Sequence, residues 1–176
     1  MLIPKTKFNT DRIVPTEKDD YFRHQLLIGD VHDMGAAMLG GVGGHAGLFS
    51  NANDLAILMQ MYLQNGSYAE KQYFNPKTIE EFTKCQFCQD ENRRGAGFDK
   101  PILPEQKGGS TCDGVSYLSF GHSGFTGTLC WADPETEIVY VFLSNRIHPS
   151  SENRKLLYMD VRTNIMQVIY DCLETK

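Results

Sequence analysis

The spacing of hydrophobic positions predicts two helices in the first half of this chain. Apolar residues recur with a period near 3.6 in residues 55–62, which indicates one face of a core helix, and Asn65-Gly66 is a typical helix end. A second, shorter helix is predicted for residues 75–83. Asn75-Pro76 favours it, because a capping side chain is followed by a residue that suits the first helical turn.

The last third of the chain predicts strands followed by a long helix. Residues 128–132 and 138–143 have the pattern of two strands joined by a type I turn. The second of them is almost continuously apolar, which predicts a central strand covered on both faces. A long helix is predicted to begin at residues 149–152 and to lie across one face of this hairpin. Its apolar stripe consists of Leu157, Val161, Ile165, Val168 and Cys172.

Other segments lack a clear period. Residues 1–33 are expected to be irregular, and a structureless run of that length is rare in a compact domain unless it covers a site or belongs to a larger body. Residues 34–50 are apolar and glycine-rich, and within them residues 41–46 are expected to form a tight turn that packs backbone on backbone. Within the irregular residues 85–117, only 93–98 resembles a short strand. Together the elements predict an α/β (α+β) fold.

Composition narrows the class of protein. The 176 residues carry a net charge of −5, with 11% aromatic and 22% charged residues, as in a globular domain of ordinary size. No Lys/Arg cluster suits nucleic acid, and no apolar run approaches the length of a membrane span. Met1–Lys5 has no signal-peptide pattern, so the chain is either cytosolic or its beginning has been cut away.

Metal and cofactor sites are not expected. Cys85-Gln86-Phe87-Cys88 is a C-x-x-C motif with Cys112 as the nearest other thiol, whereas a zinc site needs four ligands and a redox pair needs a βαβ context. We therefore predict that these cysteines are unpaired thiols in a variable insertion. Residues 41–46 match the residue types of a dinucleotide-binding fingerprint but not its structural context, because no strand is predicted before them and a capped helix follows directly.

The candidate chemistry lies in residues 119–127. Glycines at 121, 124 and 127 alternate with His122, Ser123 and Thr126. Small residues on a strand let a ligand lie against the backbone and pair with its N–H groups. A turn whose small residues serve only packing is the alternative, and the spacing does not separate the two.

Several segments in fixed order resemble the penicillin-recognising serine hydrolases, which comprise class C β-lactamases, DD-peptidases and related esterases. The resemblance runs from Thr6 to the last helix. The matching segments are residues 13–17, 29–33, 40–50, 121–127 and 142–149. It implies a partial β-lactamase-like fold, in which antiparallel strands are packed by a long C-terminal helix and joined to part of the helical region.

The resemblance also implies site residues. In this superfamily the chemistry comes from S-x-x-K, Y-x-N or S-x-N, and K-T-G motifs. His122-Ser123-Gly124 resembles the third motif with His in place of Lys, which implies that it faces the substrate, and the N–H of Phe125 is implied to be half of the oxyanion hole. The substrate-binding residues expected beside them are His32, Asp33, Thr126, Asn145 and Arg146. For His32 and Asp33, a place in a surface loop away from any pocket is an equally good interpretation.

The other two motifs are absent. No Ser is followed three residues later by Lys, and Tyr73-Phe74-Asn75 spells Y-x-N only by coincidence, since it lies in a turn after the first helix. Residues 1–176 are therefore expected to be one segment, the C-terminal portion of such a domain, beginning after a missing helix that ends near Leu2–Thr6. An acyl-enzyme needs an activated nucleophile, so this segment alone is expected to hydrolyse nothing.

Three functions stay open at this stage. The first is part of a serine hydrolase acting on cell-wall peptides or small acyl substrates; the others are a non-catalytic peptide-binding module of the same fold and a cysteine-rich metal-binding domain. Expected partners are the missing N-terminal part of the domain and the substrate, with self-association through exposed apolar surface. The resemblance further suggests export to the periplasm and a glycosidase domain fused in the parent.

Overall fold

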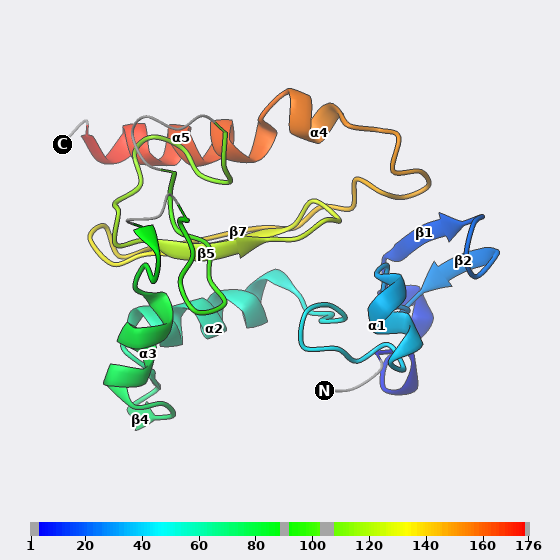
Figure 1. Cartoon of the computed structure of the whole chain (residues 1–176), viewed down its shortest axis with the longest axis horizontal. Coiled ribbons are helices and arrows are strands. Elements are labelled where there is room, and N and C mark those ends of the chain that lie inside the picture. The colour runs from blue at the N-terminus through cyan, green and yellow to red at the C-terminus, as the bar shows by residue number, and fades with distance from the viewer. Residues whose placement is uncertain (1–3, 89–91, 103–107, 175–176) are drawn as a thin grey trace. The chain divides into compact units, whose positions relative to one another are not determined.

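The computed structural model of the chain describes residues 4–88, 92–102 and 108–174 (Figure 1). The expected end of a preceding helix near Leu2–Thr6 lies partly outside these residues. The chain divides into two compact units, which are described separately. The first holds the chain up to Asn51 together with Phe125–Gly127 and Ser144–Tyr158, and the second holds Ala52–Gly124, Thr128–Leu143 and the chain from Met159 onward.

The elements form a mixed α/β fold, as the sequence predicted. The strands are β1 (Pro15–Asp19), β2 (Gln25–Ile28), β3 (Ser67–Tyr68), β4 (Lys71–Gln72), β5 (Phe120–Ser123), β6 (Leu129–Asp133) and β7 (Ile138–Phe142). The helices are α1 (Met34–Met38), α2 (Ala52–Leu63), α3 (Pro76–Thr83), α4 (Lys155–Tyr158) and α5 (Val161–Glu174), with short 3-10 turns η1 (Pro4–Thr6) and η2 (Thr10–Arg12).

The second unit is built on an antiparallel sheet with the order β5-β6-β7. In its register, Gly121 lies opposite Trp131 and His122 lies opposite Cys130. The prediction that residues 138–143 form the central strand is wrong for the described sheet, because β6 is the middle strand and β7 pairs only with β6. The sequence of β7 is apolar on both sides because helices cover both faces of the sheet, not because of its place in the strand order.

Helices cover the two faces of this sheet as separate layers. Figure 1 shows α5 along one face and α2 along the other. On the α5 side, Trp131 and Tyr140 pack with Met166 and Tyr170. On the α2 side, the buried cluster consists of Met59, Phe120 and Ala132. Successive residues of a strand point to opposite faces, so one strand supplies side chains to both clusters.

The two predicted helices of the first half are confirmed as α2 and α3. Asn75 caps α3, since its side-chain oxygen accepts a hydrogen bond from the N–H of Lys77, and Pro76 occupies the first turn. Because Asn75 is committed to this cap, Tyr73-Phe74-Asn75 is explained by local structure alone.

The predicted C-terminal helix is split, and its apolar stripe is not the buried face. The chain forms α4 and α5, and Asp160 between them has a positive φ of 45°. The residues of α5 that bury against the sheet are Met166 and Tyr170, whereas Val168 is 62% exposed. The tyrosine decides this choice of face, because its hydroxyl donates to the buried Asp133 carboxylate at 2.9 Å while its ring packs in the core.

The first unit contains an antiparallel hairpin of β1 and β2, so the expectation of irregular structure throughout residues 1–33 is wrong. The pattern was hidden because the buried positions of β1 are polar: Thr16, Glu17 and Asp19. The glycine-rich turn after α1 also differs from the prediction. Gly40 and Gly41 have positive φ and open space where a side chain would lie, so backbone conformation and not close packing requires them.

We expect Gly121→Ala to destabilise the protein by about 3 kcal/mol. An added Cβ at this position would lie 2.2 Å from the backbone oxygen of Cys130 and 2.4 Å from the Trp131 ring, and β5 cannot withdraw without losing its pairing. Calorimetric unfolding of the full chain measures the change. Gly44→Ala is the matched control, because nothing lies within 4 Å of its added Cβ. Equal melting of the two variants would contradict the prediction.

Candidate functional site

The end of β5 carries the predicted His122-Ser123-Gly124 segment. The pairing of β5 with β6 fixes which way each residue points. The imidazole of His122 and the backbone at Gly124 are exposed, and Ser123 is half-buried. The strand end is therefore accessible in the second unit, and its two reactive side chains differ in their exposure.

The outer edge of β5, which faces away from β6, is paired at Gly121. The next residue whose backbone groups point to this edge is Ser123. Gly121 exchanges two backbone hydrogen bonds with Asp99, at 2.7 and 3.1 Å. Its N–H and C=O thus face away from β6. Backbone groups two residues apart point the same way along a strand, so those of Ser123 also face the outer edge. This is the orientation that a ligand pairing with the strand requires.

Two side chains from the preceding loop contact this strand end. Arg94 Nη1 lies 3.3 Å from His122 Nε2, and the hydroxyl of the buried Ser110 donates to Ser123 Oγ at 3.1 Å. His122 Nδ1 lies 2.8 Å from the carbonyl oxygen of Ser123. Sequence reasoning missed Arg94 and Ser110, because a loop without a period gives no signal of where its side chains lie in space.

The loop is anchored by buried charged residues. The predicted strand at residues 93–98 is not formed; isolated bridges join Arg94 to Asp99 and Asp99 to Gly121. Lys100, 6% exposed, donates from Nζ to the carbonyl oxygen of Leu118 at 2.8 Å. Burial lowers the pKa of its ammonium to about 8, although attraction to Asp133 opposes the shift.

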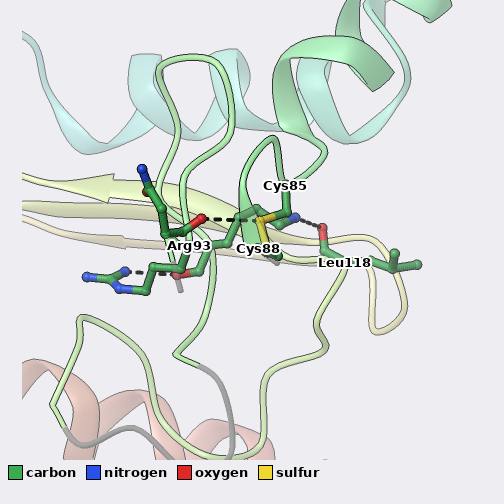
Figure 2. Close-up of a disulfide and its surroundings, with 6 residues drawn as sticks. Cys85, Cys88, Arg93 and Leu118 are labelled. Atoms are coloured by element: carbon green, nitrogen blue, oxygen red, sulfur yellow. Dashed lines mark hydrogen bonds between the residues drawn. A yellow bond between two sulfur atoms is a disulfide. The ribbon is translucent and has the colours of Figure 1, made fainter. Parts of the chain in front are cut away.

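A disulfide joins Cys85 and Cys88 at the start of this loop (Figure 2), so the prediction of unpaired thiols is wrong for this pair. The bond occupies both thiolates that a zinc site at the C-x-x-C motif would need. Gln86 lies between the two cysteines, and its N–H donates to the carbonyl oxygen of Arg94 at 2.8 Å. The disulfide loop is therefore hydrogen-bonded to the segment that contacts His122.

In the first unit, three of the predicted site residues lie together. The rings of His32 and Phe125 stack with centroids 4.9 Å apart, and the Arg146 guanidinium lies 4.4 Å from the Phe125 ring. The backbone N–H of Arg146 also donates to the carbonyl oxygen of Thr126 at 2.9 Å. These contacts hold both the side chain of Phe125 and the chain that follows it.

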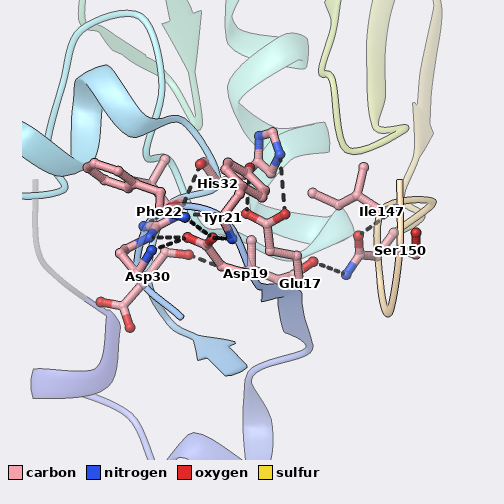
Figure 3. A network of polar contacts seen from close by, with 12 residues as sticks. Glu17, Asp19, Tyr21, Phe22, Asp30, His32, Ile147 and Ser150 are labelled. Carbon is pink, nitrogen blue, oxygen red and sulfur yellow. Dashed lines mark hydrogen bonds and ion pairs between the residues drawn. The ribbon is translucent and has the colours of Figure 1, made fainter. Parts of the chain in front are cut away.

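His32 is positioned by a network of buried charges (Figure 3). Its Nε2 lies 3.6 Å from the Glu17 carboxylate, and its carbonyl oxygen accepts from Arg23 at 3.1 Å. Arg23 also pairs with Asp19 at 2.8 Å. Burial would raise the pKa of Asp19, but hydrogen bonds from Arg23 and from three backbone N–H groups outweigh it and hold that pKa well below its usual range.

Asp33 and Asn145 have structural partners that explain their positions. The Asp33 carboxylate caps α1 by accepting from the N–H of Ala36 at 2.7 Å, and it pairs with His45 at 3.0 Å. Both interactions lower its pKa. The side-chain amide of Asn145 donates to the carbonyl oxygens of Pro15 and Thr16, which ties its segment to β1.

The predicted site residues thus form two groups. His122 and Ser123 lie with Arg94 and Ser110 in the second unit, and His32, Phe125, Thr126 and Arg146 lie together in the first. Two cavities found among the described residues are lined by other side chains. One of about 360 Å³ lies by Lys18 and His148, and one of about 190 Å³ lies between α2 and α3.

Comparisons with known proteins match most of the chain. The family model described as Beta-lactamase matches residues 4–162. A protein of Escherichia coli (strain K12) named "Putative D-alanyl-D-alanine carboxypeptidase" is 38% identical over 132 residues, covering 72% of this chain and 29% of that protein. A protein of the same name from Salmonella gallinarum is 38% identical over 140 residues, covering 76% of this chain and 31% of the relative. The chain therefore spans about three tenths of the length of these relatives.

Within residues 4–88, 92–102 and 108–174, none of the helices combines the length and the apolar character needed to cross a bilayer.

We expect the protonation of Lys100 to make stability depend on pH. Burial lowers the pKa of Lys100 to about 8 in the folded chain, from 10.5 in the unfolded one. Between these two values the unfolded chain keeps a proton on Lys100 that the folded chain has lost, so stability rises with pH. The free energy of unfolding of the wild-type chain should therefore rise relative to that of Lys100→Met between about pH 7 and 10, by about 3 kcal/mol in total. Urea unfolding across this range measures the difference. Parallel curves for the two proteins would show that the ammonium is not buried in this way.

Proposed function

Because the chain belongs to the beta-lactamase family, we propose that it is the C-terminal portion of a serine hydrolase that cleaves amide or ester bonds through an acyl-enzyme. In this proposal the end of β5 is the edge against which the acyl group of the substrate lies. His122 and Ser123 face the substrate, and the backbone N–H of Phe125 donates to the oxyanion.

The observation that carries this proposal is the orientation of the outer edge of β5. Gly121 is already paired there with Asp99, so the backbone N–H and C=O of Ser123 point to the same edge. The Ser123 carbonyl oxygen lies 2.8 Å from His122 Nδ1, so its backbone N–H is the group left for a ligand, and no described hydrogen bond within residues 4–88, 92–102 and 108–174 uses that N–H. A peptide-like substrate pairs with such groups as an added strand does.

The relatives suggest the substrate class. Two proteins that are 38% identical to this chain over 132 and 140 residues carry the name "Putative D-alanyl-D-alanine carboxypeptidase", and such a name refers to peptides that end in D-alanine. We therefore place wall-derived peptides before β-lactams or simple esters as substrates. Export to the periplasm follows from that choice and belongs to the same proposal.

A non-catalytic binding module of the same fold is the second candidate. The sequence favours it in one respect, because the 176 residues hold no S-x-x-K motif and so offer no activated serine of the family's kind. An oxyanion donor and a substrate edge without a nucleophile retain only a small part of the rate enhancement. Whether a longer protein supplies the serine separates the two candidates.

The exposed face of α5 supports the proposal that further polypeptide packs on this chain. Apolar side chains spaced three and four residues apart stand partly in solvent on this helix: Ile165 at 43%, Val168 at 62%, Ile169 at 37% and Leu173 at 45% exposure. A face of this kind is typical of a helix with a partner. The missing part of the domain or a second copy of the chain is the partner proposed.

We expect the 176 residues by themselves to form no acyl-enzyme. Without a serine activated by a neighbouring base, a chromogenic β-lactam and a p-nitrophenyl ester should give no burst of product above the buffer rate. Stopped-flow absorbance and the intact mass of the protein both measure acylation. A class C β-lactamase is the positive control, and a stoichiometric burst from this chain alone would contradict the proposal.

A further inference from the structure

The contact between Arg94 and His122 determines which ring nitrogen of the histidine carries the proton. A guanidinium group can only donate hydrogen bonds, and a carbonyl oxygen can only accept them. Arg94 Nη1 lies 3.3 Å from Nε2, and the Ser123 carbonyl oxygen lies 2.8 Å from Nδ1. Both bonds form together only when Nδ1 carries the proton and Nε2 is the acceptor.

With this tautomer, His122 has no proton to offer a ligand. Its only N–H donates to the Ser123 carbonyl oxygen, and the lone pair of Nε2 is directed at Arg94. An anion that approached the end of β5 would find no donor on the imidazole. The charged side chain that can donate there is the Arg94 guanidinium, beside the backbone N–H groups of the strand end, and the Arg94 side chain is 51% exposed.

Arg94 is held in place by a buried carboxylate. Asp99 is 3% exposed, and its Oδ1 has no hydrogen-bond donor among the described residues; its ion pairs are with Arg94 and, at a longer distance, with Arg93. A buried carboxylate is stable only when paired, so Asp99 fixes Arg94 strongly. The backbone of Asp99 in turn pairs with Gly121, the residue before His122.

The cluster keeps a net positive charge although one carboxylate belongs to it. Arg93 Nη1 lies 4.0 Å from the same Asp99 oxygen, so two guanidinium groups surround a single carboxylate. The side chain of Arg93 is 25% exposed and also donates to the carbonyl oxygen of Lys100 at 2.9 Å. Arg93 supports the loop, and Arg94 carries charge to the strand end.

We propose that Arg94 is the residue that recognises an anionic group at the end of β5, and that it holds His122 as a hydrogen-bond acceptor beside that group. The part of this inference that names a peptide carboxylate rests on the function proposed above. The part that concerns the histidine does not, because it follows from the donors and acceptors of the folded chain.

The histidine is tested without any ligand. In the full chain labelled with 15N-histidine, long-range 1H–15N correlation spectra should show the His122 proton on Nδ1 and none on Nε2, with His122→Gln used to assign the signals. A proton on Nε2 would overturn the inference, whatever the chain binds.

The anion is tested with a matched pair of probes, acetyl-D-alanyl-D-alanine and its C-terminal amide, titrated into the full chain while the amide signals of Ser123 and Gly124 are followed. The wild-type chain should prefer the acid by about tenfold, the contribution of one charge-assisted hydrogen bond. Arg94→Gln should lose this preference. The double variant Arg94→Gln/Asp99→Asn should lose it too, and it leaves no buried carboxylate unpaired.

Arg154→Gln is the charge-matched control, because Arg154 is exposed and no described ion pair or hydrogen bond joins its side chain to Arg94, Asp99 or His122, and it should keep the wild-type preference. A preference for the acid that survives without Arg94, or equal binding of acid and amide by the wild type, would overturn the role of Arg94. Failure of both probes to bind would instead count against the peptide substrate class, and the spectra of His122 would still decide the tautomer.

Discussion

The close contact between Gly121 and the Trp131 indole is the constraint on which the second unit depends. Trp131 is 1% exposed, and its Nε1 donates to the hydroxyl of Ser119 at 2.9 Å, so the ring has a single place in the core. Gly121 is the register partner of Trp131 in β5, and only a residue without a side chain fits there against the indole ring. That contact sets the register of β5, and a register shift of one residue would turn His122 to the other face.

In the first unit, a network of buried charges orders β1 and the loop that follows β2. Arg23 binds the carboxylates of Asp19 and Glu17 and the carbonyl oxygens of Val31 and His32. Both carboxylates are almost fully buried, and a buried charge that loses its partner is strongly destabilising. The same guanidinium that compensates them also orders the loop that carries His32. Stability and placement of a candidate binding residue therefore come from one interaction.

A common arrangement supports the candidate residues in both units. Each exposed or half-exposed group is held by a polar group that is itself buried: Arg94 by Asp99, Ser123 by Ser110, and His32 by Glu17. A second layer of this kind keeps a binding group in place before the ligand arrives.

The sequence by itself determined the elements whose signals are local. The period of residues 55–62, the cap at Asn75 and the turn after β6 were enough for α2, α3 and the β6–β7 hairpin, and the ordered motifs were enough for the family. Local signals succeed there because neighbours in sequence make the interactions concerned. Local signals failed where contact with a residue far away in the sequence determines the structure.

Only the tertiary structure decided the rest. The polar β1 became a strand because Arg23 compensates its carboxylates, and α5 buried Tyr170 in place of its apolar stripe because the Asp133 carboxylate accepts a hydrogen bond from the tyrosine hydroxyl. Arg94 reaches His122 across 28 positions of sequence through a loop that has no period. Such pairings depend on which groups come into contact once the chain is folded, and the local sequence pattern does not indicate these contacts.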